Sequence, residues 1–350
     1  MSRITVFGGG SWGTALALSA ARSGHSVLIW CRREEQAAAI NSERRNPDYL
    51  QSAELPGTVS ATSDAGLAAS FSSNWVLALP TQSLRAFLPF IRPLFQPGRE
   101  ICNLAKGIEI GTGARVSEIV DELLPGCEYT VLSGPSFAAE VARGLPTALA
   151  AASRRRESAR LWQSMLNART LRVYTSQDVA GVETGGAVKN IMAIASGMAL
   201  ALGLGDNARA ALVSRGLAEI MRLGEALGAH PQTLAGLTGM GDLVLTCYSE
   251  QSRNFRLGAA LGRGLSLEDA QRQVGQTAEG AFTARAVVEC AGRLSVDMPI
   301  SLGVNRLLYE GSSPQEELDR LVSRDAKEEY PPDMMWGSSR AKLPKRERDV

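Results

Sequence analysis

Histidine and aromatic residues are scarce in this chain of 350 residues. A histidine-based metal site or acid–base mechanism would have to use His25 or His230, the two histidines of the sequence. His25 follows a glycine in a predicted turn, and His230 precedes a proline in a predicted loop between helices. We therefore expect no metal site, and an acid–base group of another kind. Because aromatic residues make up only 5% of the chain, the core is expected to consist mainly of Ala, Leu, Val and Ile.

The chain also lacks an excess of charge of either sign. Its 37 basic and 36 acidic residues leave a formal net charge of +1. Proteins that bind nucleic acid usually carry a large basic excess, so we expect no nucleic-acid partner. The basic run at 154–156 is expected to be a solvated surface turn.

Neither disulfides nor membrane spans are expected. The five cysteines are odd in number and show no C-x-x-C spacing, which is typical of reduced thiols. The first residues hold no apolar segment of signal-peptide length, and the longest apolar stretch, 191–204, is too short to cross a bilayer. We expect a cytoplasmic protein with no stable membrane insertion.

Two domains are expected from the length, because domains usually comprise about 150 residues. In the first half, short β-branched runs alternate with amphipathic helical patterns, which is typical of parallel βαβ units. The predicted strands are 4–7, 27–31, 75–79, 101–104, 129–132, 147–152 and 171–174. The N-terminal domain is therefore predicted to be an α/β, Rossmann-like parallel sheet.

The second half has the apolar spacing of helices from residue 187 onward. Its predicted helices are 191–204, 208–227, 255–262, 282–294 and 300–309. Asp206 or Asn207 is expected to cap the second of these, and Gly228 to end it. We predict an all-α C-terminal domain, with the α/β domain over 1–185, the helical domain over 186–325, and a charged, partly disordered tail over 326–350.

A glycine-rich turn follows the first predicted strand. Gly8, Gly10 and Gly13 form G-x-G-x-x-G between this strand and a predicted helix over 14–23, which is the context that dinucleotide binding requires. The first glycine permits a tight turn, the second lets the backbone approach a pyrophosphate, and the third lets helix pack on strand. The N–H groups at the helix start would then face the anion. The alternative is a glycine-rich turn without a ligand.

The second predicted strand is followed by Arg32 and Arg33. Sites that prefer NAD place Asp or Glu there, to bind the ribose 2′-hydroxyl. A planar guanidinium suits a 2′-phosphate instead, so the sequence predicts a preference for NADP(H), with NAD(H) also possible. Because Glu34 and Glu35 follow, the alternative is a charged helix start.

Lys189 is the candidate for the acid–base group. It lies in the segment 185–190, GGAVKN, at the start of the long apolar helix where the two halves meet. A lysine that is buried beside other positive groups has a lowered pKa and can exchange a proton near neutral pH. The alternative is a surface lysine whose charged end reaches solvent.

Four further segments could complete a cationic pocket for a small anionic substrate. Asp242 follows glycines and could orient and charge-pair a lysine, and residues 252–254 place hydroxyl, guanidinium and amide side by side. Lys106 follows the predicted strand 101–104, and residues 133–138 come at the end of the next strand, where they could supply backbone donors. Each segment also fits a helix cap, a turn or a surface charge.

Together these motifs resemble, in order and spacing, those of bacterial NAD(P)-dependent glycerol-3-phosphate dehydrogenases. The resemblance covers about residues 1–322 and is carried by Gly8–Gly13, Ala105–Gly107, Ser133–Ala138, Gly185–Asn190, Gly241–Cys247, Gln251–Asn254 and Glu279–Gly280. It implies a dinucleotide-binding domain, a helical substrate domain and a homodimer. The implied reaction is reversible hydride transfer between NAD(P)H and dihydroxyacetone phosphate, giving sn-glycerol 3-phosphate for glycerophospholipid synthesis.

The resemblance also implies roles for single residues. Lys189 matches the proton acceptor of the family, and Asp242 is expected to orient it. The implied substrate contacts are Lys106, Gly134, Ser136, Lys189, Asp242, Ser252, Arg253 and Asn254. The expected cofactor contacts are Gly8, Gly10, Ser11, Trp12, Gly13, Arg32, Arg33, Lys106, Ala138, Arg253, Thr277 and Glu279.

Three segments depart from the family pattern. Glu183 and Thr184 precede the double glycine where an apolar residue is more usual, residues 276–279 replace a more apolar segment, and residues 77–81 stand where Val-Pro-Ser is common. Two other functions stay open at this point. A β-hydroxyacid dehydrogenase would need a carboxylate-binding site, and a non-enzymatic NADPH-binding sensor would bind the cofactor without turnover.

Overall fold

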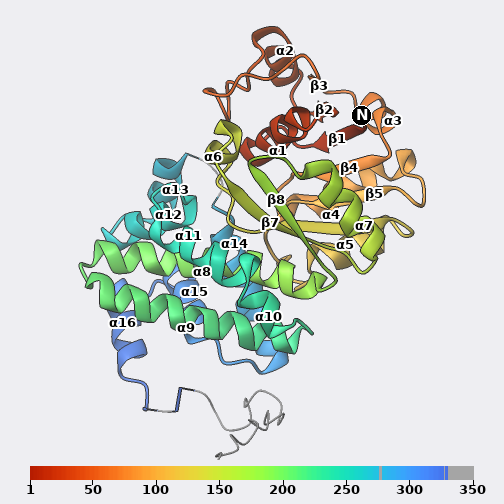
Figure 1. Ribbon diagram of the computed structural model, residues 1–350. Coiled ribbons are helices and arrows are strands. Elements are labelled where there is room, and N and C mark those ends of the chain that lie inside the picture. The colour runs from red at the N-terminus through yellow and green to blue at the C-terminus, as the bar shows by residue number, and fades with distance from the viewer. Residues whose placement is uncertain (276–277, 327, 330–350) are drawn as a thin grey trace, which may run out of the picture.

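The computed structural model describes residues 1–275, 278–326 and 328–329 (Figure 1). A sheet with helices on both faces forms the N-terminal part, and a bundle of helices forms the rest. The predicted Rossmann-like α/β domain and the helical second part are both confirmed. The expected tail over 326–350 lies almost wholly outside the described residues.

The sheet has eight strands in the order β3-β2-β1-β4-β5-β6-β7-β8. The strands are β1 Arg3–Phe7, β2 Ser26–Trp30, β3 Val59–Thr62, β4 Asn74–Leu77, β5 Glu100–Asn103, β6 Glu128–Ser133, β7 Thr147–Ala152 and β8 Leu171–Ser176. All neighbouring pairs are parallel except β6 and β7, which run antiparallel. The sequence did not predict β3, because its short run Val-Ser-Ala-Thr buries only one large apolar side chain, that of Val59.

Helices cover both faces of this sheet. The helices of the N-terminal part are α1 Ser11–Arg22, α2 Glu34–Glu43, α3 Ala65–Phe71, α4 Thr81–Ile91, the 3₁₀ turn η1 Arg92–Leu94, α5 Val116–Leu123, α6 Ala138–Arg143 and α7 Arg156–Leu166. Ile4 and Val6 of β1 pack with α1, α2 and α7, whereas Phe7 packs with α3, α4 and α5. Alternate residues of a strand point to opposite faces, so this central strand contributes to both apolar cores.

The remaining helices form the second part of the molecule. They are α8 Val179–Ala201, α9 Gly205–Ala226, α10 Pro231–Leu234, the π-helical turn η2 Leu237–Gly241, α11 Asp242–Tyr248, α12 Arg253–Gly262, α13 Leu267–Val274, α14 Glu279–Leu294, α15 Pro299–Tyr309 and α16 Pro314–Val322. The helix α9 starts at Gly205, so Asp206 lies in its first turn and does not cap it. Gly228 follows its end with a positive φ of 80°.

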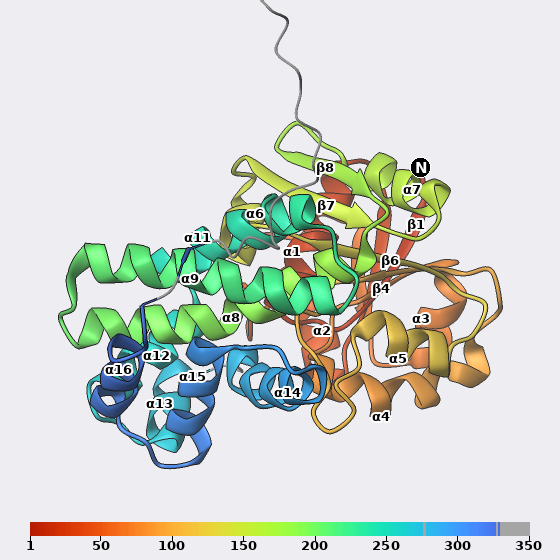
Figure 2. The same ribbon diagram turned by 90° about the horizontal axis from the view of Figure 1, so that it is seen from below.

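The helix α8 is the central element of this second part. It packs against α9, α11, α12 and α14 (Figure 2), and nearly all of its side chains are buried. It begins soon after β8 and runs through residue 185, so the domain boundary that the sequence suggests falls inside one continuous helix. The exact division into domains stays a prediction.

Glycines allow α8 and α12 to approach closely. A Cβ atom on Gly197 would lie 2.0 Å from the carbonyl oxygen of Phe255, and one on Gly258 would lie 1.9 Å from that of Ile194. Both distances are far below van der Waals contact, so no other residue fits at either position without moving a helix.

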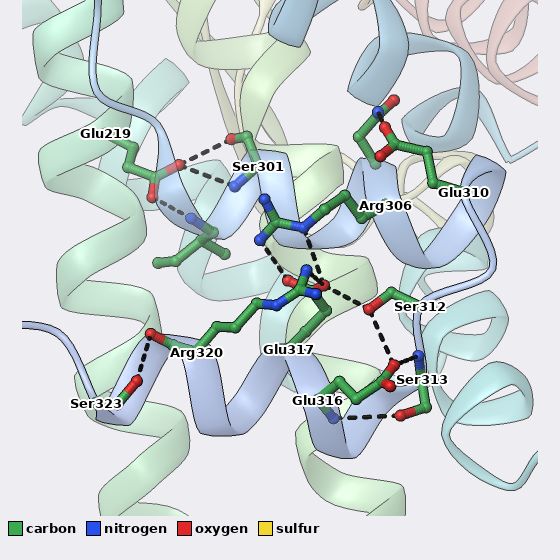
Figure 3. A network of polar contacts seen from close by, with 12 residues as sticks. Glu219, Ser301, Arg306, Glu310, Ser312, Ser313, Glu316, Glu317, Arg320 and Ser323 are labelled. Carbon is green, nitrogen blue, oxygen red and sulfur yellow. Dashed lines mark hydrogen bonds and ion pairs between the residues drawn. The ribbon is translucent and has the colours of Figure 1, made fainter.

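Buried carboxylates connect the outer helices (Figure 3). Glu219 of α9 accepts hydrogen bonds from the backbone N–H groups of Ile300 and Ser301. These donors lie in the first turn of α15, where N–H groups have no partner within the helix itself. Glu317 of α16 accepts two hydrogen bonds from the guanidinium of Arg306 on α15, at 2.9 and 2.6 Å. These contacts hold α15 against α9 and α16 against α15.

The two histidines make structural contacts. Nε2 of His25 lies 2.9 Å from the carbonyl oxygen of Met165, and its Nδ1 accepts a hydrogen bond from the Ser2 N–H. His230 is the N-cap of α10, and its backbone N–H donates to Asp178. Within the described residues, none of the helices combines the length and the hydropathy that crossing a bilayer requires.

The close contact of α8 and α12 generates a stability prediction. We expect Gly258→Ala to lower the free energy of unfolding by about 1–3 kcal/mol, the usual cost of overpacking. The matched control is Gly292→Ala in α14, where a Cβ would meet no atom within 4 Å. That variant should be unchanged or more stable by up to about 1 kcal/mol, because alanine favours helix. Chemical denaturation measures both, and equal midpoints would contradict the packing argument.

Candidate active site

The glycine-rich turn between β1 and α1 is closely packed on two sides and open on the third. A Cβ on Gly8, whose φ is +123°, would lie 2.4 Å from the carbonyl oxygen of Ala78, and one on Gly13 would lie 2.2 Å from that of Gly8. A Cβ on Gly10 would meet no atom within 4 Å. This open position lies next to the start of α1, where a pyrophosphate can approach the backbone N–H groups. The turn therefore fits a dinucleotide.

Polar side chains fix this turn from a second segment. Nδ2 of Asn46, which is fully buried, donates to the Gly9 carbonyl at 2.8 Å and to Oγ1 of Thr14 at 2.7 Å. Gln36 of α2 donates to the same carbonyl at 2.7 Å. Ser11 donates its hydroxyl to the carbonyl of Tyr49 at 3.3 Å. The sequence analysis missed Asn46 and Gln36, because no local pattern marks a contact across 27 or 37 residues.

The two arginines after β2 lie in different surroundings. Both are exposed. Arg33 forms an ion pair with Asp48. The side chain of Arg32, by contrast, makes no hydrogen bond or ion pair with any other described residue. Trp12, the other predicted cofactor contact near the turn, buries its indole Nε1 without a hydrogen-bond partner in the described part of the chain.

Lys106, Lys189 and Asp242 come from distant parts of the chain and meet in one cluster. Nζ of Lys106 donates to Oδ2 of Asp242 at 2.7 Å and to the carbonyl of Gly134 at 3.0 Å. Nζ of Lys189, in α8, donates to Oδ1 of Asp242 at 3.0 Å and to Oγ1 of Thr246 at 2.8 Å. Asp242 is only 1% exposed and Lys189 6%, so one buried carboxylate serves two lysines.

Burial and charge set the protonation states of this cluster. Burial lowers the pKa of Lys189 to about 8; Asp242 opposes this shift, and the positive charge of Lys106 adds to it. Burial would raise the pKa of Asp242, but the two lysines hold it below its ordinary value. Asp242 therefore stays ionised while Lys189 can gain or lose a proton near neutral pH.

Thr246 is a contact of this cluster that the sequence analysis missed. Besides accepting from Lys189, its hydroxyl donates to the backbone carbonyl of Asp242 at 2.6 Å. A signal was available, because residues four apart on one helix lie on the same face. Thr246 follows Asp242 by four residues in α11.

The segment 133–138 begins at the last residue of β6, beside the lysine cluster. Gly134 has a φ of +138° and supplies the carbonyl that Lys106 binds. The hydroxyl of Ser136 donates to the same carbonyl at 2.9 Å. Ala138 is the first residue of α6. Gly134 and Ser136 therefore lie in the short loop after β6, and Ala138 directly follows this loop; all three are near the carboxyl end of a strand, where α/β sheets bind their ligands.

Residues 252–254 contact three different elements. Ser252 caps α12 by accepting from the Phe255 N–H. The guanidinium of Arg253 donates to Oγ of Ser11 at 3.2 Å, so it reaches the dinucleotide turn from the helical part. The amide of Asn254 donates to Oδ1 of Asn190 at 2.9 Å and accepts from the Gly280 N–H at 3.0 Å. The Asn254 amide thus ties α8 to α14.

Glu279, the first residue of α14, lies near enough to Arg253, Lys106 and Lys189 for their charges to act on it. It lines a cavity of about 210 Å³ together with Thr81, Gly107 and Phe282. Burial raises its pKa, which a hydrogen bond from the Thr81 backbone and the charges of Arg253, Lys106 and Lys189 oppose. The predicted contact Thr277 lies outside the described residues.

The arrangement can bind an anion and move a proton. The cluster of two lysines and one carboxylate carries a net charge of +1 when all three are ionised, and Arg253 adds a further positive charge. A lysine with a pKa near 8 is suited to general acid–base catalysis at physiological pH. Arg253 also contacts Ser11, the residue that follows the open position at Gly10, so this guanidinium connects the lysine-bearing helical part with the dinucleotide turn.

Known proteins are similar to this chain in sequence and fold. Residues 3–159 match the family described as NAD-dependent glycerol-3-phosphate dehydrogenase N-terminus, and residues 178–319 match the corresponding C-terminus. Glycerol-3-phosphate dehydrogenase [NAD(P)+] of Thioalkalivibrio sulfidiphilus is 48% identical over 328 residues, covering 93% of this chain and 98% of that protein.

A second relative and a crystal structure agree with this assignment. Glycerol-3-phosphate dehydrogenase [NAD(P)+] 2 of Salinibacter ruber is 46% identical over 93% of this chain and 96% of that protein. The structure of glycerol-3-phosphate dehydrogenase from Coxiella burnetii superposes with a TM-score of 0.90 at 37% identity, covering 92% of this chain and 99% of that one. The chain therefore belongs to the NAD-dependent glycerol-3-phosphate dehydrogenase family.

Proposed function

We propose that this protein is an NAD(P)-dependent sn-glycerol-3-phosphate dehydrogenase. It interconverts dihydroxyacetone phosphate and sn-glycerol 3-phosphate, and in the reducing direction supplies the latter for glycerophospholipid synthesis. The observation that carries the proposal is the buried Lys106–Asp242–Lys189 cluster, in a chain that belongs to this family. This site supplies positive charge that can bind the phosphate of the substrate, and a proton donor for its carbonyl oxygen.

In the reducing direction, the protein holds the substrate and supplies a proton. The bound nicotinamide, when reduced, supplies the hydride that C2 of the substrate accepts. Lys189, as an ammonium, donates a proton from Nζ to the oxygen on C2, and the ketone becomes an alcohol. Asp242 orients this ammonium through Oδ1, while Thr246 fixes its second hydrogen bond. Lys106 and Arg253 provide positive charge for the phosphate.

In the oxidising direction, Lys189 works as a base. Its neutral amine accepts the hydroxyl proton of glycerol 3-phosphate, while C2 loses a hydride that an oxidised nicotinamide would accept. The neutral form is accessible because burial lowers the pKa of Lys189 to about 8. Asp242 keeps that pKa from falling further, so both protonation states are populated near neutral pH.

The cofactor is an NAD(P) dinucleotide, and we propose that NADP(H) is preferred. Arg32 supports this preference, because it is exposed after β2, and its guanidinium is available for a 2′-phosphate. Arg33 lies beside it but is engaged with Asp48.

We also propose that the enzyme works in the cytoplasm as a homodimer. The five cysteines are all free and four of them are buried, which supports a reducing compartment. The homodimer is supported by the resemblance of the sequence to this family, which implies a dimer.

The catalytic role of Lys189 gives the first test of the proposed function. The wild-type protein should oxidise NADPH when dihydroxyacetone phosphate is added, and Lys189→Ala should lower turnover by about 10²–10⁴-fold, the usual contribution of a general acid. Retained binding of NADPH by the variant is the control for folding. No turnover by the wild-type protein would contradict the function, and near-wild-type turnover by the variant would remove Lys189 from catalysis.

The pKa of Lys189 predicts opposite pH dependences for the two directions. Reduction needs the ammonium, so its kcat/KM should fall as pH rises through about 8. Oxidation needs the neutral amine, so its kcat/KM should rise with pH and level off above about 8. Initial rates from pH 6 to 10 measure both. Profiles that are parallel in the two directions would show that another group titrates.

The assignment of Arg32 to the 2′-phosphate predicts a selective loss. Arg32→Glu replaces an attraction to the phosphate by a repulsion, so the KM for NADPH should rise by at least about tenfold, the scale of a lost charge-assisted hydrogen bond. The KM for NADH should change much less, because NADH has no 2′-phosphate. Equal effects on the two values would refute the assignment.

A further inference from the structure

An exposed ion pair lies where the chain leaves β2. The guanidinium of Arg33 pairs with the carboxylate of Asp48, and the two side chains are 50% and 40% exposed. Arg33 is the N-cap residue of α2, whereas Asp48 belongs to the segment 46–50 that follows this helix. Asp48 has no part in the proposed catalytic mechanism.

The position of Asp48 is fixed by its neighbours in the chain. Two residues before it, the buried Asn46 holds the Gly9 carbonyl and Thr14. One residue after it, the Tyr49 carbonyl accepts a hydrogen bond from Ser11. Asp48 therefore lies on a segment that is anchored on both sides to the dinucleotide turn, and its carboxylate is held at this edge of the site.

Both charges of the pair act at the end of β2. Cys31, the residue just after this strand, has a thiol whose burial raises the pKa to about 12, with Arg33 opposing the shift and Asp48 adding to it. Arg32 and Arg33 together carry a charge of +2. Asp48 lowers the sum of these three charges to +1, and its ion pair engages one of the two guanidinium groups.

We propose that Asp48 is a specificity-determining residue, which holds Arg33 away from the 2′-phosphate of NADPH and so limits the preference for this cofactor. Arg32 alone then meets the phosphate. An exposed ion pair contributes little stability, so it can compete with a phosphate contact without preventing it. The proposal rests on the proposed function, in that it places the adenosine end of the dinucleotide at this corner.

Asp48→Asn tests this proposal, since it removes the charge and keeps the size of the side chain. The dissociation constants of NADPH and NADH are measured by fluorescence titration of the full-length protein, without substrate. We expect NADPH to bind about three- to tenfold more tightly to the variant, as Arg33 gains a phosphate contact and a nearby negative charge is lost. NADH, which has no 2′-phosphate, should change by less than about twofold.

Two further variants separate this role from a general change of charge. Asp121→Asn breaks a comparably exposed ion pair, Arg154–Asp121, and changes the net charge by the same amount. It should leave both dissociation constants unchanged. In an Arg33→Ala background, Asp48→Asn should lose most of its effect, because Asp48 acts through Arg33.

Each other outcome decides against part of the account. Unchanged NADPH binding by Asp48→Asn, or the same gain in the Arg33→Ala background or in Asp121→Asn, would overturn the role of Asp48 and leave the proposed function standing. Tighter binding of both dinucleotides would also overturn it. A wild-type protein that binds neither dinucleotide would overturn the proposed function, and the role of Asp48 with it.

Discussion

The sharing of the buried Asp242 carboxylate by Lys106 and Lys189 is the interaction on which the rest of the site depends. Two cations on one anion leave a net positive charge in a place that is nearly closed to water. An isolated lysine buried to this extent would lose its charge, whereas one paired with its own carboxylate would stay charged. The shared carboxylate places Lys189 between these limits, and the three ionised groups together keep a net charge of +1.

Close packing of backbone holds this cluster together. The carboxylate belongs to α11, one lysine to α8 and the other to the loop after β5, so any shift of α8 would separate the charges. Glycines fix α8 on two sides, since Gly185 lies against the backbone of η2 and Gly197 against that of α12. The Asn254 amide then connects α8 with α14, where Glu279 faces the cations. The close packing of α8 therefore keeps Lys189 beside Asp242, and so maintains the ion pairs of the cluster.

The sequence alone predicted the parts of the site that are carried by local patterns. The glycines between β1 and α1 and the lysine of an apolar helix are visible because each motif has its own flanking context. Asn46 and Asp48 were missed, because their contacts arise only when distant segments fold together. Thr246 was missed although it follows Asp242 by one turn of the same helix. The strand β3 was missed for a different reason, since Val-Ser-Ala-Thr lacks the bulky apolar residues that mark a strand. Antiparallel pairing of β6 and β7 likewise has no local signature.

The most direct test of this account is an NMR titration of the Lys189 ammonium in protein with isotope-labelled lysine. The sequence holds five lysines, three of them beyond residue 326, so few signals appear, and Lys189→Ala assigns the one of interest. The account predicts that Lys189 titrates with a pKa near 8 in the free enzyme. A pKa at the ordinary value of 10.5 would show that burial and the shared carboxylate do not set its charge, and would contradict the central claim.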